Sequence, residues 1–359
     1  MEDLHVYDYF DKYTFLCDMY DEDSDSIIEL VLHFFPFDNS VQVINTAKGK
    51  NLLKRVQLPP LKLEMLQIGN IVNIFSKLLL ITDCAPVTRR TLFNNVQSTF
   101  ALIKPVPPSE HGKIITFIMQ NGFRITQMKN GKLSKDFAME LYASVAGSKM
   151  MPIIIDYVTG GEVIGLELVA PDAVSKWRKC LGATDPADAA PGTLRNLYGE
   201  NILKNVAHGC NTLEDAKKML AQFFGYANGI PIISFRATFT NCTCCVIKPH
   251  AVIEGNVGAI MEQIALSGKF YISAIAMFSV KLANASEFYE IYKGVLQEYE
   301  KRLFTNKFIN LQDLCRQLYP DSIRAQYGKS ILHNAVHCTD LPEDGEMEVE
   351  YFFKLLASD

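Results

Sequence analysis

Two short motifs occur twice in this chain, in the same order each time. Ile-Lys-Pro stands at residues 103–105 and again at 247–249, and each copy precedes a similar string, Asn-Val-Ala-His-Gly at 205–209 and Asn-Ala-Val-His-Cys at 334–338. Motifs that recur in a fixed order indicate two related folding units. Each unit is therefore expected to bring one lysine and one histidine, far apart in sequence, into a similar setting.

The residues that follow each lysine motif also repeat. Each copy continues with an apolar run at helical spacing and then a glycine turn, Asn-Gly-Phe at 121–123 or Ser-Gly-Lys-Phe at 267–270. The apolar runs are Ile114, Ile115 and Ile118 in the first copy, and Val257, Ile260, Met261 and Ile264 in the second. Each copy thus predicts a strand, a Lys-Pro loop, an amphipathic helix, a turn and another strand. The fold class is α/β or α+β.

Length and charge limit the class of protein. A chain of 359 residues exceeds one ordinary domain and predicts two or three. Its net charge of −5 argues against a nucleic-acid or anionic-membrane binder, because such proteins carry clustered Lys and Arg. No apolar run approaches the roughly 18 residues of a membrane span, and the N-terminus lacks a signal-peptide pattern. We expect a soluble intracellular protein with neither nucleic acid nor membrane as partner.

Nine cysteines, an odd number scattered along the chain, suit a reducing compartment better than a disulfide framework. Cys242, Cys244 and Cys245 have two interpretations, a metal knuckle or a core strand that runs into Ile-Lys-Pro. Successive side chains of a strand point to opposite faces, so these thiols would not converge on one ion. The strand is the favoured interpretation, and no metal site is expected.

Residues 1–92 share nothing with the repeat. They contain β-like runs at 28–35, 41–44 and 71–81, with turn signals at 36–39 and 47–50. The acidic patch at 21–25 predicts a solvated hairpin tip, because it lacks the glycine and the final glutamate of an EF-hand loop. We expect a small β-rich docking domain at 1–92, followed by one repeat unit at 96–228 (module A) and the other at 236–359 (module B).

The repeated lysine and histidine suit phosphate chemistry. A neutral imidazole can accept a phosphoryl group when an acceptor fixes its second ring nitrogen. Lysine and arginine then balance the charge on the phosphate oxygens. A single histidine is as often a core or surface residue, but two copies beside an asparagine favour a phosphohistidine site.

Five strings of module A stand in a recognisable order. They are Ala-Leu-Ile-Lys-Pro at 101–105, Trp-Arg at 177–178, Gly-Ala-Thr-Asp-Pro at 182–186, Pro-Gly-Thr-Leu-Arg at 191–195 and Asn-Val-Ala-His-Gly at 205–209. This order resembles the signature of the nucleoside diphosphate kinase family. With the second copy and residues 337–345, the chain is most similar to the long ciliary and flagellar members, in which an axonemal β-domain precedes two kinase-like modules. The resemblance implies an α+β fold with two ferredoxin-like βαββαβ modules after a small β-rich domain.

The resemblance also implies roles for particular residues. In module A, His208 would be the phosphorylated residue, with Tyr142 beside it and Asn205 on the ribose. Lys104, Arg178, Thr184 and Arg195 would bind the phosphates, and Met150 stands where the family has an aromatic residue that stacks on the base. The family reaction is a ping-pong transfer of the γ-phosphoryl group from a nucleoside triphosphate to a diphosphate, with Mg²⁺ held mainly by the nucleotide.

Both modules depart from the family pattern. In module A, Met219 replaces the glutamate eleven residues after the histidine, while Val106 and Cys210 replace an aspartate and a serine. The loss of that glutamate removes the acceptor that orients the imidazole.

Module B keeps more of its histidine environment and less of its phosphate clamp. It retains Tyr292, Asn334, His337, Thr339 and Glu348 at the expected positions. However, Lys248 and His337 are 89 positions apart, against 104 between Lys104 and His208. Arg324 is the counterpart of Arg195, but Arg178 and Thr184 have no identifiable counterpart in module B. His337 is therefore the weaker candidate.

These departures lead to a main hypothesis and two alternatives. The main one is a structural microtubule-associated protein of the axoneme, bound to tubulin and other proteins inside doublet microtubules, in the cytoplasm and cytoskeleton of the cilium or flagellum. The first alternative is an active nucleoside diphosphate kinase that uses His208 and magnesium-bound ATP or GTP. The second is nucleotide sensing without transfer, through Lys104 and the arginines.

Overall fold

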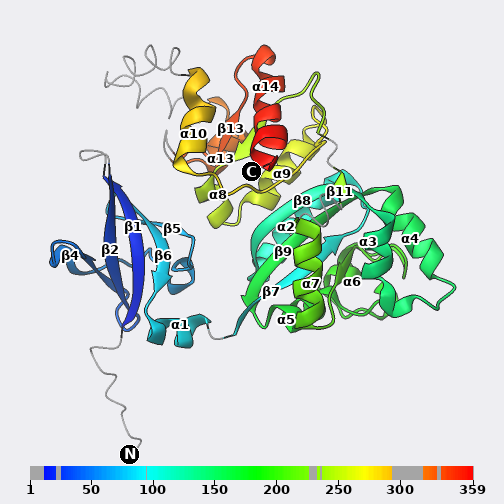
Figure 1. Ribbon diagram of the computed structural model, residues 1–359, viewed down its shortest axis with the longest axis horizontal. Helices are drawn as coiled ribbons and strands as arrows, with labels where there is room; N and C mark the ends of the chain where they lie inside the picture. The colour runs from blue at the N-terminus through cyan, green and yellow to red at the C-terminus, as the bar shows by residue number, and fades with distance from the viewer. Residues whose placement is uncertain are drawn as a thin grey trace, which may run out of the picture. The chain divides into compact units, whose positions relative to one another are not determined.

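The computed structural model describes residues 12–21, 26–93, 95–225, 233–234, 237–292, 318–329 and 333–358. The chain divides into two compact units, Met1–Asn95 and Val96–Asp359. The first is built mainly from strands and the second mixes helices and strands (Figure 1). Among the helices of the described residues, none is long and apolar enough to cross a membrane.

The N-terminal unit is a curled six-stranded antiparallel sheet in the order β4-β3-β2-β1-β6-β5 (Figure 1). Its strands are β1 (Tyr13–Asp21), β2 (Ser26–Phe35), β3 (Ser40–Asn45), β4 (Lys50–Gln57), β5 (Ile71–Ile74) and β6 (Lys77–Cys84), with a short helix α1 (Pro86–Phe93) after them. Period-2 alternation buries one face: in β1, Phe15 and Cys17 are inside, whereas Leu16 and Tyr20 are exposed. That face forms a core with the 3₁₀ turn Leu63–Met65.

One stretch that was predicted as a single strand in this unit forms two strands. The predicted run at 71–81 is a hairpin whose turn, Phe75 and Ser76, has φ of 49° and 69°. Two successive left-handed residues are the geometry of a tight hairpin turn. Such a turn usually carries Asn-Gly, so Phe-Ser was not recognised as one. The acidic patch follows Asp21, which pairs with Ser26 across the β1–β2 hairpin; its residues 22–25 lie outside the described residues.

Module A is a five-stranded sheet in the order β10-β7-β9-β8-β11. The strands within residues 96–228 are β7 (Val96–Ile103), β8 (Arg124–Leu133), β9 (Glu162–Pro171) and β10 (Ala207–Gly209). The short β11 (Ile233–Ser234) follows the predicted end of module A and pairs with β8. Its helices are α2 (Pro108–Gln120), α3 (Lys135–Leu141), α4 (Met151–Gly160), α5 (Ala173–Leu181), α6 (Leu194–Tyr198) and α7 (Leu213–Phe224). Taking β7 to β10 with α2 and α5, the order is βαββαβ, so the predicted α+β, ferredoxin-like fold is confirmed.

Strand β7, which lies between β10 and β9, is buried on both faces from Thr99 to Ile103, and each face belongs to a different core. Ala101 and Ile103 pack with α2 and α5, including Trp177, while Phe100 and Leu102 pack with α3, α4 and α7. Two buried faces explain why the strand reads as a continuous apolar run rather than an alternating one. The end of this rigid strand leads directly into the lysine motif.

Module B contains fewer strands in the described residues. Its elements are β12 (Cys245–Ile247), α8 (Pro249–Ile253), α9 (Val257–Leu266), α10 (Leu282–Phe288), the 3₁₀ turn η4 (Tyr289–Tyr292), α13 (Ile323–Tyr327), β13 (Val336–Cys338), the 3₁₀ turn η5 (Pro342–Asp344) and α14 (Gly345–Glu350), followed by a π-helical turn (Tyr351–Leu355) and a 3₁₀ turn (Leu356–Ser358). β12 and β13 pair with each other. The predicted cysteine strand is therefore shorter than expected, because Cys242 and Cys244 precede it. The strand expected after the Ser-Gly turn is reduced to one bridge, between Ala276 and Lys129.

The two modules pack on each other within the C-terminal unit. Helix α2 lies against α9, and a Cβ atom on Gly112 would stand 2.5 Å from the carbonyl oxygen of Gly258. Beside the helices, Asn130 receives a hydrogen bond from the backbone N–H of Ile275 at 2.6 Å and donates its own backbone N–H to the carbonyl of Ile275 at 3.1 Å. Glycine at positions 112 and 258 allows the backbones of α2 and α9 to approach this closely.

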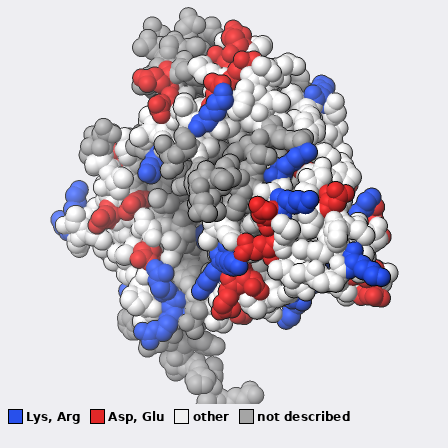
Figure 2. Space-filling view, turned by 45° about the vertical axis from the view of Figure 1, so that its right-hand side comes forward, with Lys and Arg blue, Asp and Glu red and all other residues white. Residues whose placement is uncertain are grey.

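Charge is mixed on the surface. Figure 2 shows Lys and Arg side chains interspersed with Asp and Glu side chains on the face in view. This pattern differs from the single-sign stripe that tracks a nucleic-acid backbone.

Candidate functional site

The histidine of each module follows the same unusual turn. Val206 has φ of 70°, and the N–H of Ala207 bonds to the carbonyl of Asn205 at 2.8 Å. In module B, Ala335 has φ of 68°, and the N–H of Val336 bonds to the carbonyl of Asn334 at 2.9 Å. A bond from residue i to i+2 around a residue with positive φ is a γ-turn, a strained conformation that persists where the surrounding structure enforces it. Both modules therefore keep the backbone geometry in front of their histidine.

In module A the turn places His208 on the edge strand β10, opposite Leu102 of β7. The backbone carbonyl of His208 accepts a hydrogen bond from the indole N–H of Trp177 at 3.3 Å. Trp177 is fully buried on α5 and packs edge-on against Phe123. The backbone of His208 is thus held on one side by pairing with β7 and on the other by the buried Trp177 side chain of α5.

Cationic side chains surround His208. Lys104, at the end of β7, is only 4% exposed, and its Nζ donates to the carbonyl of Leu203 at 3.3 Å. Arg195 donates from Nη1 to the carbonyl of Gly182 and from Nη2 to that of Ala207, both at 3.1 Å. These bonds hold a positive charge in fixed positions next to β10.

Burial and these charges set the protonation states at the site. Desolvation, followed by the charges of Lys104, Arg195 and Arg178, lowers the pKa of His208 to about 3. Desolvation and Arg195 lower the pKa of Lys104 to about 8. The imidazole is therefore neutral at physiological pH, which is the form that can act as a nucleophile.

The next residues around His208 have buried polar atoms without protein partners. The ring of Tyr142 lies edge-on to the His208 ring at 5.0 Å, and the Nζ of Lys104 lies 5.6 Å from the centre of the Tyr142 ring. Among the described residues, the Tyr142 hydroxyl, Asn205 Oδ1 and Arg195 Nε are buried without a hydrogen-bond partner. Burying polar atoms unpaired is costly, so three in one place indicate a site shaped for a polar ligand.

Other predicted site residues of module A lie further out. Arg178 is exposed and donates to Oδ1 of Asn211, which also lines a cavity of about 660 Å³ between α5 and α7. Thr184 is exposed, and its carbonyl accepts from Asn205 Nδ2 at 2.9 Å. Met150 is 36% exposed at the start of α4. His208 does not line this cavity. In this structure Arg178 acts on His208 through its positive charge, which lowers the pKa of the imidazole.

The imidazole of His208 has no side-chain hydrogen bond from any described residue. Met219, on α7, is 5% exposed and packs in the core beside Phe223 and Cys210. Desolvation raises the pKa of the Cys210 thiol to about 12, so this group is not an anionic partner either. Module A thus has a neutral nucleophile and a cationic surround, but no acceptor that fixes the ring.

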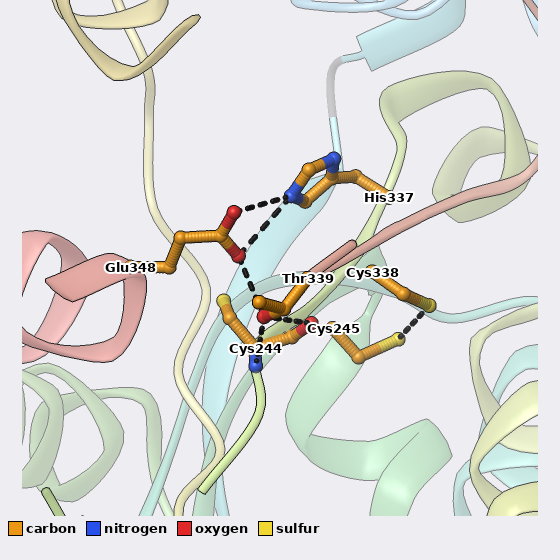
Figure 3. Close-up of polar contacts among 6 residues, drawn as sticks. All are labelled: Cys244, Cys245, His337, Cys338, Thr339 and Glu348. Carbon is orange, nitrogen blue, oxygen red and sulfur yellow. Dashed lines mark hydrogen bonds and ion pairs between the residues drawn. The ribbon is translucent and has the colours of Figure 1, made fainter. Parts of the chain in front are cut away.

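Module B has the opposite arrangement. The Nε2 of His337 lies 3.2 Å from both carboxylate oxygens of Glu348 (Figure 3). The hydroxyl of Thr339 donates to Glu348 Oε2 at 2.8 Å and accepts from the backbone N–H of Cys244 at 2.9 Å. Glu348 is 1% exposed at the base of α14. The carboxylate is therefore buried, hydrogen-bonded and aligned with the ring.

This contact defines the form of the neutral imidazole. In the neutral form, a proton on Nε2 is stabilised by the carboxylate of Glu348, so the lone pair lies on Nδ1. The rings of Phe288 and Tyr289 pack edge-on against His337, with centroids at 5.3 Å and 5.8 Å. Ring orientation in module B is thus fixed by a carboxylate and two aromatic side chains.

A tyrosine that the sequence did not single out lies beside His337. Tyr289 contacts the His337 ring as Tyr142 contacts that of His208. Tyr292 was expected at this place; its side chain lies outside the described residues, so that expectation stays a prediction. The dipeptides Leu-Tyr at 141–142 and Phe-Tyr at 288–289 are a sequence signal that could have identified Tyr289.

The cations of module B are fewer in the described part of the chain. Lys248 is half-buried, and burial together with the nearby Arg324 lowers its pKa. Arg324 itself is exposed on α13. Oδ1 of Asn334 is buried without a partner among the described residues. Any counterpart of Arg178 within residues 293–317 lies outside the described residues.

The metal knuckle has no support in the described ranges, where no group of three His, Cys, Asp or Glu side chains could hold a metal ion. Cys244 and Cys245 lie on opposite sides of the backbone, as Figure 3 shows.

Comparison with known proteins identifies the family that this chain resembles. The nucleoside diphosphate kinase family profile matches residues 97–228 and 311–357. Nucleoside diphosphate kinase homolog 7 of Rattus norvegicus is 37% identical over 372 residues, which covers 96% of this chain and 94% of the rat protein. The corresponding protein of Mus musculus is 36% identical over the same shares.

Solved structures of the family match a smaller share of the chain. The nucleoside diphosphate kinase of Aquifex aeolicus gives a TM-score of 0.33 at 26% identity, over 35% of this chain and 93% of that one. The Halobacterium salinarum enzyme in complex with CDP gives 0.32 at 27% identity, over 35% and 85%. It is the similarity to the rat and mouse proteins, extending over nearly the whole length of each, that shows this chain to belong to the nucleoside diphosphate kinase family.

Proposed function

We propose that this chain is a structural protein of the ciliary or flagellar axoneme, bound inside doublet microtubules and built on two degenerate nucleoside diphosphate kinase modules. The observation that carries the proposal is that each histidine lacks a different part of the site. Within the described residues, His208 has Lys104 and Arg195 but no carboxylate, while His337 has Glu348 but fewer cations. Two sites that have lost different parts are expected where a fold is kept for its surface.

The two losses weaken catalysis for different reasons. Removing the group that orients a reactive imidazole costs about 10- to 100-fold in comparable sites. Removing a bidentate arginine from a phosphate clamp weakens both binding and charge stabilisation in the transition state. The backbone features, by contrast, are intact in both modules, including the γ-turns at Val206 and Ala335. The backbone features that shape the two sites are thus better preserved than the side chains on which the rate of phosphotransfer would depend.

The proposed partners are tubulin and neighbouring proteins of the doublet microtubule, in the cytoplasm and cytoskeleton of the cilium or flagellum. The support is similarity over nearly the whole chain to the rat and mouse homologs, together with a separate N-terminal β-rich unit. A net charge of −5 and interspersed surface charge give no support to a nucleic-acid or membrane partner.

A second candidate function is phosphotransfer at His208. The observation that favours it is the half-buried, neutral imidazole beside Lys104 and Arg195, with three buried polar atoms that have no partner among the described residues. The donors there are cations, an amide and a hydroxyl, so a magnesium ion would be held by the phosphate oxygens of ATP or GTP, not by the protein. Bound in that way, Mg²⁺ would supply charge neutralisation between the phosphates.

One experiment separates the two functions. The purified full chain is incubated with γ-³²P-labelled ATP, chased with a nucleoside diphosphate, and compared with His208→Ala and His337→Ala. Acid-labile label that moves to the diphosphate and disappears in one variant would establish phosphotransfer. The structural proposal expects turnover far below that of a dedicated family enzyme, together with saturable co-sedimentation on microtubules that both variants retain.

Two results would contradict the structural proposal. One is a turnover rate equal to that of a dedicated nucleoside diphosphate kinase assayed in parallel. The other is failure of the folded chain to sediment with microtubules or with doublet fractions.

A further inference from the structure

Two cysteines of module B face each other across the β12–β13 pair. Cys245 lies directly opposite Cys338 in the strand register, and their Sγ atoms are 4.0 Å apart (Figure 3). They are 93 residues apart in sequence. They lie on the face of the strand pair away from the His337–Glu348 contact, so neither thiol belongs to the histidine site (Figure 3).

The strand register makes this pair suitable for a disulfide. Backbone bonds join Lys248 to Ala335 and Thr339 to Cys244. Because hydrogen-bonded and non-hydrogen-bonded pairs alternate along antiparallel strands, Cys245 and Cys338 fall at a non-hydrogen-bonded position. Directly opposite residues there have Cα atoms about 4.5 Å apart, within the range that a disulfide spans without backbone movement.

The thiols are also accessible, unlike the same positions in module A. Their counterparts there, Ala101 and Gly209, are paired in the sheet, and a Cβ atom on Gly209 would stand 2.5 Å from the Trp177 ring of α5. In module B, Cys245 is exposed and Cys338 is partly exposed.

The local charges favour a thiolate at Cys338. A hydrogen bond with Cys245, then the charges of Arg324 and His337, outweigh desolvation and Asp340 and lower the pKa of Cys338 to about 7. The same shared hydrogen bond raises the pKa of Cys245. One sulfur is thus ready to ionise at neutral pH while the other keeps its proton, the arrangement of a reactive thiol beside a resolving thiol.

We propose that Cys245 and Cys338 form a redox site that hydroperoxides or glutathione disulfide convert to a cross-strand disulfide. With hydrogen peroxide, the Cys338 thiolate attacks one oxygen, the O–O bond breaks, and the released hydroxide takes up a proton to give Cys338 sulfenic acid and water. Cys245 then attacks that sulfur, the S–O bond breaks, and the hydroxide leaves with the Cys245 proton as a second water. The two sulfurs are oxidised by two electrons and the peroxide is reduced.

With glutathione disulfide, the Cys338 thiolate attacks one sulfur, the glutathione S–S bond breaks, and a mixed disulfide between Cys338 and glutathione forms as one glutathione leaves as its thiolate. Cys245 then displaces the second, so the reaction runs backwards when reduced glutathione is in excess. The product joins the first and last strands of module B and closes a long loop, which restricts the unfolded chain and stabilises the folded module. The reaction is independent of phosphotransfer by either histidine.

The site is tested on the folded full-length protein. The chain is equilibrated across a series of GSH/GSSG ratios, remaining thiols are alkylated, and tryptic peptides are analysed by mass spectrometry. We expect a loss of two hydrogens and a peptide pair joining Cys245 to Cys338, formed at a lower GSSG fraction than any other cysteine modification. Because Cys242, Cys244 and Cys245 share one tryptic peptide, the Cys244→Ser variant assigns the link, and we expect that variant to keep it.

The single-cysteine variants give a kinetic check. In Cys245→Ser, the resolving thiol is absent, so a glutathione adduct should accumulate at Cys338. In Cys245→Ala, which also removes the hydrogen-bond donor to the thiolate, the rate of adduct formation at pH 7 should fall. The control Cys180→Ser, in a half-exposed position of module A with no cysteine beside it, should leave the link unchanged.

Two outcomes would overturn the proposal. One is a stable glutathione adduct at Cys338 of the unmutated protein without conversion to the Cys245 link. The other is a link from Cys338 to a different cysteine, or no link at ratios that already modify Cys180. Retained circular dichroism of each variant shows that a lost link is not caused by unfolding.

Discussion

At the scale of single residues, the two modules differ in one pair of positions around the histidine. Glu348 and Thr339 form a buried polar network with His337, and the same positions beside His208 hold Met219 and Cys210. Both members of the network have changed together. Because both positions now carry weakly polar or apolar side chains, neither leaves an unpaired carboxylate or hydroxyl in the core. The fold can therefore tolerate the pair of changes, while the imidazole loses its acceptor.

This comparison predicts that the missing network can be grafted into module A. In a His337→Ala background, the double change Met219→Glu with Cys210→Thr should raise the rate of phosphohistidine formation at His208 by about 10- to 100-fold, because a carboxylate then orients the ring. The rate is measured as acid-labile label from γ-³²P-labelled ATP. Met219→Gln with Cys210→Thr is the matched control and should give a smaller rise, since an amide does not stabilise the charge that develops on the ring. An unchanged rate in the folded double variant would show that the carboxylate is not what limits His208.

A second residue-scale prediction concerns a buried histidine outside both sites. Desolvation lowers the pKa of His111, on α2, to about 4, and its Nε2 is buried without a partner among the described residues. Because the folded pKa lies below the unfolded value of about 6.5, the unfolded chain binds more protons between those two pH values. Stability should therefore fall as the pH drops from about 6.5 towards 4, by on the order of 2 kcal/mol from this group at pH 4.5.

The measurement is urea unfolding of the Val96–Asp359 unit within the full chain at pH 7 and pH 4.5. His111→Gln removes the titration and should reduce the stability difference between the two pH values by that amount. An equal difference in the variant would exclude His111 as the cause. His208, whose pKa is also lowered, should contribute to what remains.

At the scale of elements, the contact between α2 and α9 depends on two glycines. Gly112 and Gly258 bring the helix backbones together, so that a Cβ atom on Gly258 would stand 2.5 Å from the backbone nitrogen of Thr116. Such contacts leave no room for even one methyl group, because the atoms they meet are backbone and cannot rotate away.

Gly112→Ala should therefore destabilise the C-terminal unit by about 1–3 kcal/mol, since the added methyl group forces the helices apart. Gly160→Ala is the matched control, because Gly160 is also helical and a Cβ there meets nothing within 4 Å. That change should be neutral or stabilising by up to about 1 kcal/mol, the helix-propensity gain of alanine. Chemical denaturation of the two variants side by side measures both. Equal effects would mean that α2 and α9 are not held by close backbone contact.

At the scale of the whole molecule, the chain consists of two units with separate cores. The N-terminal unit has its own sheet and a core of fifteen buried apolar residues, among them Phe15, Leu32 and Ile81. The two modules of the C-terminal unit, by contrast, share buried residues: Val257 and Met261 of α9 belong to the same core as Ile114 of α2. Independence is thus expected between the units but not between the modules.

Residues 1–95 expressed alone should consequently unfold in a cooperative thermal transition, because that core is complete without the rest of the chain. Residues 96–228 alone should be less stable than residues 96–359, since removing module B exposes the α2 face that α9 covers. Circular dichroism melts of the three fragments test both statements. A fragment 1–95 without a transition, or a module A fragment as stable as the whole C-terminal unit, would contradict this division.

Much of this architecture could be predicted from the sequence because its signals are local. The helix spacing of Ile114, Ile115 and Ile118 predicted α2, and the repeated lysine and histidine motifs predicted two related units. The family signature then implied the βαββαβ order and placed Lys104, Tyr142 and Asn205 near His208. A hairpin turn at Phe75 and Ser76 was missed, because left-handed backbone there is imposed by strand pairing on both sides and not by turn residues.

What the sequence determined by itself is therefore the set of elements, their order and the chemical groups they carry, since periodicity and short motifs record these within a few neighbouring residues. What only the tertiary structure decided is which distant groups meet: Gly112 with Gly258, Tyr289 with His337, and Cys245 with Cys338. Such contacts depend on strand register and helix packing. A shift of one residue in a strand turns every side chain to the other face, and no local pattern in this chain specifies that choice.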